Sequence, residues 1–294
     1  MTDQQNVYEL IQKRDLWKSD ISGELYQVGP KIPKHVWEEI GTKVSTNEKQ
    51  PIMKVDPSKI ITLRFDGNNF SNIIPRLKKA GFLEQGFSTT FAKIIQGATK
   101  KVMEKFNAIS GFTQSDEITI IINKQVTDGA THTFSGRRDK LETLGASIIS
   151  THFVRELSKI KELPDNIDVL FDARMAVWDT LEDAFEVILW RAYDCSVNGV
   201  STAVANFGAL PNVRKDNTGA KLAWLVSNNK LPLDPHEAYG TLFVKIKKQL
   251  KAINRITNEE IDITRGIIDV VLGNVLINVK NKKITIVNEA FVIG

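Results

Sequence analysis

The sequence predicts an α+β fold: an antiparallel sheet in the order strand–helix–strand–strand–helix–strand, with helices on one face of the sheet. Three patterns lead to this expectation. A short β-branched apolar run at residues 60–65 indicates a buried strand. Residues 88–107 repeat apolar side chains with the spacing of one helical face. Two further apolar stretches within residues 111–122 flank an acidic turn, which predicts a hairpin.

The first predicted strand ends in a carboxylate and a turn. Asp66 directly follows the apolar run, and Gly67, Asn68 and Asn69 come next, all residue types that form turns. Such a turn ends the strand and leaves Asp66 at its exposed end, facing the crevice where ligands of α/β sheets usually bind. Gly67 lets the backbone turn tightly and brings its carbonyl close to whatever Asp66 holds. A plain turn without a ligand is the alternative interpretation.

A second acidic turn strengthens the functional interpretation. Asp116 and Glu117 lie at the tip of the predicted hairpin. A strand, a helix and an acidic hairpin form the first half of a polymerase palm, in which carboxylates of neighbouring strands converge on metal ions. Two Asp side chains and a backbone carbonyl suit Mg²⁺, which prefers oxygen ligands and keeps several waters. Two such ions can hold a triphosphate and stabilise both the attacking and the leaving oxygen.

Four motifs resemble those of a known family. The segments RFDGNNF, QSDE, FDAR and WRAYDCSVNG follow one another between about Ile60 and Gly199, roughly half of the chain. They resemble the tRNA(His) guanylyltransferase family, the 3′–5′ nucleotide polymerases with a palm core. Members of that family use two metal ions to add nucleotides to the 5′ end of tRNA. Ala173 stands where they usually have Gly.

The resemblance implies a site and partners for this chain. We expect two Mg²⁺ ions as cofactors, NTPs (GTP and ATP) and tRNA as partners, and a homo-oligomer, by resemblance a tetramer. The residues expected to be catalytic are Asp66, Asp116 and Glu117, and the metal ligands are Asp66, Gly67 and Asp116. The residues expected to bind the nucleotide are Asn68, Asn69, Phe70, Ser71, Ser115, Arg137, Arg138 and Lys140.

Two basic stretches are candidates for binding anions. Arg137, Arg138 and Lys140 lie at the start of a predicted helix, about residues 139–160, where backbone N–H groups and the helix dipole favour phosphate. The second stretch is predicted to be helical and contains Lys245, Lys247, Lys248, Lys251 and Arg255. Of its members Lys247, Lys248 and Lys251 are expected to contact RNA, together with Asn198, whose amide carries donors and acceptors. A solvated basic face is the alternative, because a net charge of +4 permits a polyanionic partner without requiring one.

The other segments are expected to pack around this core. The chain is divided into a helical extension at 1–58, a catalytic core at 59–200 and a C-terminal α+β region at 201–294 that ends in a β-hairpin. Within the core, residues 167–178 predict a strand and residues 181–193 a helix. No apolar run approaches the ~20 residues that span a bilayer. Because the start also lacks the apolar segment of a signal peptide and Cys195 is the single cysteine, we expect no membrane partner and a cytoplasmic protein.

Other functions remain open at this point. A nucleotide cyclase shares the strand–helix–acidic-hairpin core, and a non-catalytic RNA- or nucleotide-binding module is a third possibility. Gln114 and Ser115 precede the acids as in the guanylyltransferase family, and both acids are present. Ser196 and Gly199 stand where tRNA(His)-specific members have His and Asn, so fewer polar groups remain to recognise a base. We therefore expect a repair-type member that extends 5′-truncated tRNAs.

Overall fold

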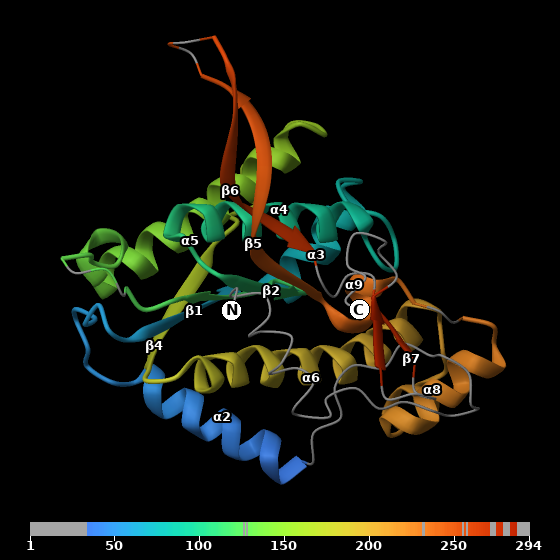
Figure 1. Cartoon of the computed structure of the whole chain (residues 1–294). Helices are drawn as coiled ribbons and strands as arrows, with labels where there is room; N and C mark the ends of the chain where they lie inside the picture. Colours follow the sequence, from blue (N-terminus) through green and yellow to red (C-terminus); the bar gives the residue numbers. More distant parts are fainter. Residues whose placement is uncertain are drawn as a thin grey trace.

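A six-stranded antiparallel sheet runs through the centre of the molecule (Figure 1). The computed structural model describes residues 34–270 except 126, 128, 231, 232, 255 and 257, together with two short strands at 275–278 and 283–286. The strand order is β4-β1-β3-β2-β5-β6. The strands are β1 (Ile60–Gly67), β2 (Ser110–Gln114), β3 (Glu117–Ile122), β4 (Phe171–Trp178), β5 (Thr241–Ile253) and β6 (Glu260–Val270).

The first four strands and the helices between them follow the predicted chain order. Helices α3 (Phe70–Lys79) and α4 (Thr89–Phe106) connect β1 to β2, and α5 (Arg138–Ser158) connects β3 to β4. β1 pairs antiparallel with both β3 and β4, which places it in the middle of this four-stranded unit. The predictions of an α+β class, of the β2–β3 hairpin and of the helices near residues 88–107 and 139–160 are confirmed.

The helices of the βαββαβ unit lie on one face of the sheet, as predicted, and helices outside this unit cover the other face. Helices α3, α4 and α5 pack on one face, and α6 (Leu181–Asn206) packs on the other together with α2 (Lys34–Glu48). The reason is visible in β1, where residues 60–65 are all buried. Successive side chains of a strand point to opposite faces, so a strand that is buried throughout needs cover on each side.

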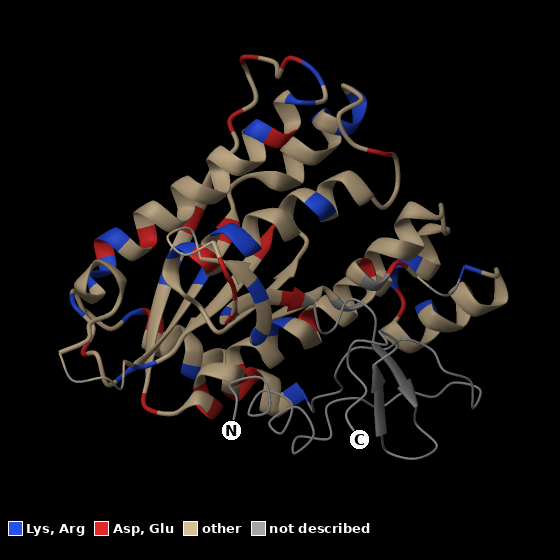
Figure 2. Ribbon diagram, turned by 45° about the horizontal axis from the view of Figure 1, so that its top comes forward, with Lys and Arg blue, Asp and Glu red and all other residues tan. Residues whose placement is uncertain are grey.

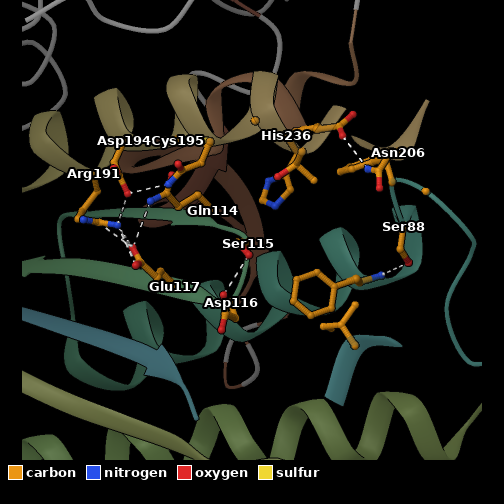
Figure 3. A pocket seen from close by; sticks show the side chains of 18 of the residues that line it. Ser88, Gln114, Ser115, Asp116, Glu117, Arg191, Asp194, Cys195, Asn206 and His236 are labelled. Carbon is orange, nitrogen blue, oxygen red and sulfur yellow. Dashed lines mark hydrogen bonds and ion pairs between the residues drawn. The ribbon is translucent and has the colours of Figure 1, made fainter. Parts of the chain in front are cut away.

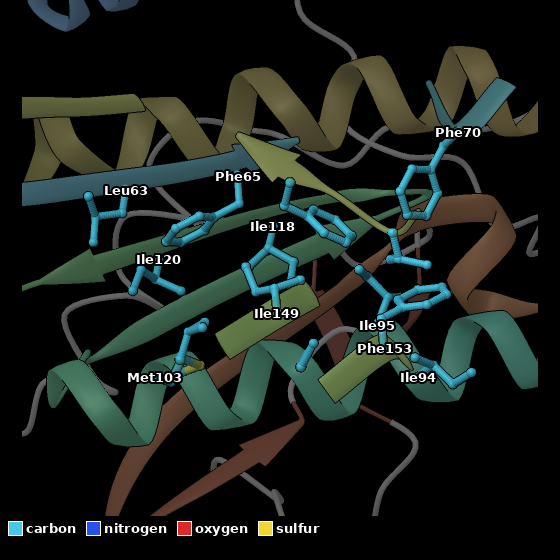
Figure 4. Packing of buried hydrophobic residues seen from close by; sticks show 14 of the residues in the cluster. Leu63, Phe65, Phe70, Ile94, Ile95, Met103, Ile118, Ile120, Ile149 and Phe153 are labelled. Atoms are coloured by element: carbon cyan, nitrogen blue, oxygen red, sulfur yellow. The ribbon is translucent and has the colours of Figure 1, made fainter. Parts of the chain in front are cut away.

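The larger core lies between the sheet and α4 and α5 (Figure 4). Leu63 and Phe65 of β1 and Ile118 of β3 are fully buried there. They pack against side chains of both helices, among them Ile95 of α4 and Phe153 of α5. Burial of each such side chain stabilises the fold by about 1.5–3 kcal/mol, so this layer fixes the position of β1 and of the residues at its end.

A buried ion pair joins α2 to the opposite face. Arg64 is 8% exposed, and its Nε and Nη2 atoms donate to the two carboxylate oxygens of Glu48 at 2.9 and 3.0 Å. On the same face, the indole nitrogen of Trp178 donates to the hydroxyl of Thr62 at 2.9 Å. Of the predicted helical extension at 1–58, α2 therefore packs on the core sheet, whereas residues 1–33 fall outside the described part of the chain.

The C-terminal region adds two strands and a projecting arm. β5 pairs with β2 only from Thr241 to Val244, and beyond this point it pairs with β6 alone. The two strands form an arm that extends away from the sheet (Figure 1). Lys245, Lys247, Lys248 and Lys251 lie on β5, so the predicted helix here is wrong. Backbone groups of this stretch are satisfied by β6, a partner that local spacing does not reveal.

Helices α7 (Pro211–Lys215), α8 (Thr218–Ser227) and α9 (Pro235–Tyr239) pack against α6. Helix α6 continues well past the predicted end at residue 193, and the predicted domain boundary at residue 200 falls inside it. The other short elements are η1 (Thr133–Gly136), β7 (Val275–Asn278) and β8 (Lys283–Ile286). β7 and β8 pair antiparallel.

The described helices include none that is long and apolar enough to cross a membrane. Lysine and arginine side chains are interspersed with acidic ones along the ribbon (Figure 2).

Candidate active site

Three carboxylates form a row across the sheet where β1 ends. Asp66 is paired with Glu117 of β3 on one side and with Asp172 of β4 on the other. Directly opposite residues of antiparallel strands project from the same face. Burial, and then the neighbouring charges of Glu117 and Asp172, raise the pKa of Asp66. A row of this kind is electrostatically unfavourable unless a cation or a basic side chain offsets it.

Asp116 approaches this row from the tip of the β2–β3 hairpin. The amide of Gly67 donates to the backbone oxygen of Asp116 at 3.2 Å. A Cβ atom on Gly67 would lie 2.8 Å from Oδ2 of Asp116 and 2.5 Å from the Phe70 ring, so only glycine permits this approach. Burial, together with the charges of Asp66 and Glu117, raises the pKa of Asp116 to about 6. The predicted metal ligands Asp66, Gly67 and Asp116 are therefore brought together.

Glu117 has a different environment from the other two acids. The guanidinium of Arg191 on α6 donates to both of its oxygens at 2.7 and 2.8 Å, and the amide of Gln114 donates at 3.1 Å. The same guanidinium donates to Asp194 at 2.9 Å, and Asp194 in turn accepts a hydrogen bond of 3.0 Å from Asn198. Glu117, predicted to be catalytic, therefore fastens the hairpin tip to α6.

The predicted nucleotide-binding turn leads directly into helix α3. The amide of Asn68 donates to the carbonyl of Leu170 at 2.9 Å, and Asn69 adopts a left-handed conformation with φ of 60° before the helix begins. The Phe70 ring is buried against Phe171, with ring centroids 5.0 Å apart. The amides of Phe70 and Ser71 belong to the first turn, where N–H groups have no partner within the helix. These amides follow the acidic row directly in the chain.

A pocket of about 320 Å³ opens beside Asp116 (Figure 3). Its walls come from the hairpin tip, from α3, from the start of α4, and from α6 and α9. In Figure 3 the Arg191–Glu117 ion pair lies at one end of the pocket and Asn206 with Ser88 at the other. The polar lining includes Ser115, Asp116, Lys78, Asn198 and Glu237. Its volume falls within the range of small-molecule sites.

The basic residues at the start of α5 are not brought to this pocket. The backbone around Arg137 pairs with Lys54, and His132 contacts the carbonyl of Lys59, just before β1 begins. Asp66 lies near the other end of β1, about 20 Å away for an eight-residue strand. Arg138 donates to the carbonyls of Glu48 and Gln50 at 3.0 and 2.7 Å and pairs with Glu142. Arg137 pairs with Asp139, and Lys140 is exposed at the same end.

Several pocket residues escaped the sequence analysis. Lys78 lies four residues after Ile74 on α3, so both reach the pocket from one helical face. This spacing was available in the sequence. Asn206 and Glu237 lie beyond the four motifs and reach the pocket only because α9 packs on α6, which no local pattern reveals. Asp172 pairs with Arg174 at 3.7 Å, the structural ion pair that the alternating spacing suggests.

Comparison with known proteins finds a similar family. A family model described as tRNAHis guanylyltransferase (Thg1) matches residues 42–179, slightly less than half of the chain, and this range includes Asp66, Asp116 and the FDAR segment. Over this range the chain is similar to the tRNAHis guanylyltransferase family. Members of the family are nucleotidyltransferases. The match contains all three predicted metal ligands but ends just before α6, so the α6–α9 wall of the pocket lies outside it.

Individual proteins are also similar to this chain. The uncharacterized protein R259 of Acanthamoeba polyphaga mimivirus is 26% identical over 246 residues, 76% of this chain and 82% of that protein. The probable tRNA(His) guanylyltransferase of Drosophila melanogaster is 26% identical over 145 residues, 49% of this chain and 48% of that protein. The solved structure of a bacterial Thg1-like protein in complex with ATP has a TM-score of 0.57 at 18% identity and covers 80% of this chain and 91% of its own. This last likeness concerns the fold.

Proposed function

We propose that this protein is a Mg²⁺-dependent nucleotidyltransferase that adds NTPs to the 5′ end of tRNA or of a tRNA-like RNA. The observation that carries the proposal is the close approach of Asp116, at the tip of the β2–β3 hairpin, to Gly67, which directly follows Asp66 at the end of β1. Asp116 also lines a pocket of about 320 Å³. The match to the family model over residues 42–179 supports the reaction type. The Drosophila relative is named for action on tRNA(His), and the bacterial Thg1-like protein has been solved with ATP and with GTP.

The residues present fit Mg²⁺. Burial raises the pKa of both Asp66 and Asp116, and neighbouring carboxylates add to this, which is the environment that a bound cation relieves. Among the described residues no group of three His, Cys, Asp or Glu side chains is arranged to hold a metal ion. Mg²⁺ is commonly held by one or two carboxylates together with waters and substrate phosphates. Two bound ions would offset charge on the triphosphate and on the attacking and leaving oxygens.

The chain's own groups orient the nucleotide around these acids. The amides of Phe70 and Ser71 at the start of α3 suit the phosphates, because a helix N-terminus carries partial positive charge. Lys78 lies near the end of the same helix, lines the pocket and supplies a full positive charge there. The Arg191–Glu117 pair keeps the hairpin tip, and with it Asp116, in position. Positioning and preorganised charge are the main contributions of proteins to phosphoryl-group transfer.

We assign the RNA contact to the arm. Lys247 and Lys248 are exposed on β5, and the Lys251 side chain is 73% exposed although it pairs with Glu260. An arm that leaves the sheet and carries several lysines suits a phosphate backbone, which it would contact without reading sequence. A homo-tetramer, expected from the resemblance, would bring additional surfaces to the same RNA.

Ser196 and Gly199, the two positions that suggested a repair-type specificity, are both packed inside the protein. Ser196 is 7% exposed, and its hydroxyl donates to the carbonyl of Tyr193. A Cβ atom on Gly199 would lie 2.1 Å from the backbone oxygen of Glu237. Both residues are thus packing positions in this chain, so their small size does not indicate a lost RNA contact. The repair-type activity is retained as a proposal on the family resemblance alone.

One incubation separates the candidate reactions. The protein is mixed with labelled GTP or ATP, Mg²⁺ and either full-length tRNA(His) or 5′-truncated tRNAs of other identities. A tRNA lengthened at its 5′ end supports the proposal, and preference for the truncated RNAs supports the repair-type activity. A cyclic nucleotide would indicate a cyclase, and no product with any RNA would contradict the proposed function.

A further inference from the structure

One wall of the pocket is built by residues beyond the family match. Glu237 lies on α9 and Asn206 at the end of α6, and both line the pocket. Helix α9 is held against α6 at Gly199, where the Glu237 backbone approaches so closely that no side chain fits. The carboxylate of Glu237 is therefore carried by a backbone whose position is fixed by packing.

The Glu237 carboxylate is partly buried and lines the pocket. Its Oε1 atom accepts a hydrogen bond of 3.3 Å from the amide of Asn206. Burial raises the pKa of Glu237 to about 7, and Asp234 adds to this, whereas Asn206 and Lys78 oppose it. A half-buried carboxylate is costly without further donors. A ligand bound in the pocket can provide these hydrogen-bond donors.

The composition of the pocket suggests how a nucleotide would lie. Asp116 is on the hairpin side, where the phosphates of a metal-bound nucleotide belong. Ile74 of α3 and Phe91 of α4 provide apolar surface, which suits the face of a base. Glu237 and Asn206 then meet the edge of that base. A carboxylate there accepts two hydrogen bonds from a base that presents two adjacent N–H donors.

We propose that Glu237 selects guanine in this pocket by accepting hydrogen bonds from its N1–H and its 2-amino group. Asn206 positions the carboxylate. Guanine is the standard base with these two donors side by side, whereas adenine presents an acceptor at N1 and can give the ionised carboxylate a hydrogen bond only from its 6-amino group. A site built to bond particular donors rejects an analogue that lacks them. This inference rests on the proposed function, and it makes GTP the preferred nucleotide at this site.

Equilibrium binding tests the inference separately from catalysis. Dissociation constants for GTP, ITP and ATP are measured by isothermal titration calorimetry on the full-length protein with saturating Mg²⁺ and without RNA. A bidentate pair between a side chain and a base discriminates by about 10- to 100-fold, so GTP should bind at least tenfold more tightly than ATP. ITP lacks the 2-amino group and should fall between them.

Glu237→Gln should reduce the preference for GTP to about twofold while leaving the affinity for ATP within twofold of the wild type. Glu104→Gln changes an exposed glutamate of α4 to the same amide and is the control. It should change neither the preference for GTP nor the affinity for ATP. If Glu237→Gln fails to fold by circular dichroism, Asn206→Ala replaces it and should weaken GTP binding several-fold more than ATP binding.

Three results would overturn the assignment: equal binding of GTP and ATP by the wild type, equal weakening of both by Glu237→Gln, or a full preference for GTP in folded Asn206→Ala. Equal weakening would indicate that the carboxylate contacts the ribose hydroxyls, which both nucleotides share. In each of these cases a nucleotide is still bound, so the proposed function survives. Binding of none of the three nucleotides would instead contradict the proposed function itself.

Discussion

Replacing Asp116 by asparagine should stabilise the metal-free protein while it abolishes nucleotide addition. Burial and the charges of Asp66 and Glu117 raise the pKa of Asp116 from 3.8 to about 6. This difference corresponds to about 3 kcal/mol of unfavourable free energy for the ionised group at pH 7. The asparagine side chain carries no charge, and its amide oxygen can keep the 3.0 Å hydrogen bond that the Ser115 hydroxyl donates to Asp116. We expect a gain of about 1–3 kcal/mol in the free energy of unfolding.

The difference in stability between the wild type and Asp116→Asn should depend on pH. Because the folded protein holds the Asp116 proton more tightly than the unfolded chain, the wild type gains stability as the pH falls from about 7 through 6 towards 4. Asp116→Asn lacks this gain, so the two proteins should converge in stability near pH 4. Urea unfolding in EDTA at pH 7, 6, 5 and 4 measures the difference. Adding Mg²⁺ should stabilise the wild type more than the variant. A variant less stable than the wild type at pH 7, or a difference that does not change with pH, would refute this explanation.

The remaining predictions concern other parts of the structure. Gly67→Ala should reduce nucleotide addition at least tenfold with an unchanged circular dichroism spectrum, because its Cβ would lie 2.5 Å from the Phe70 ring and 2.8 Å from Asp116; wild-type activity would show that the approach is not needed. Arg138→Ala should lower the free energy of unfolding by about 1–3 kcal/mol through the loss of its bonds to residues 48 and 50, with no change in KM for the nucleotide. A raised KM with unaltered stability would instead place Arg138 at the triphosphate. A triple change to glutamine on the arm should weaken tRNA binding several-fold and reduce its dependence on salt, with nucleotide affinity unchanged, and unchanged RNA affinity would exclude the arm as the RNA contact. The three residues are Lys247, Lys248 and Lys251.

The core of the fold and the acidic pair could be predicted because local patterns specify them. The apolar runs that contain Phe65 and Ile118 define two buried strands, and the turns next to them place Asp66 and Asp116 at neighbouring strand ends. The position of Arg137 could also have been derived. β3 begins at the acidic tip and runs away from it, so the segment that follows β3 must lie at the opposite end of the sheet.

Other features depend on contacts that no short pattern encodes. Ile246, Leu250 and Ile253 recur with helical spacing, yet this stretch forms β5 because residues 260–270 pair with it. The long-range pairing overrides the local periodicity. Likewise, Glu237 reaches the pocket because Gly199 lets α9 approach α6, and neither residue carries a signal in the sequence that connects it to the other.

The central claim is that Asp66 and Asp116 direct the addition of a nucleotide to the 5′ end of tRNA. The most direct measurement is the position of the label after incubation of tRNA with α-labelled GTP and Mg²⁺, determined by nuclease mapping of the product. The wild type should place the label at the 5′ end, EDTA should prevent incorporation, and Asp66→Ala should show none while keeping its fold. Label at the 3′ end, or undiminished incorporation by folded Asp66→Ala, would contradict the account.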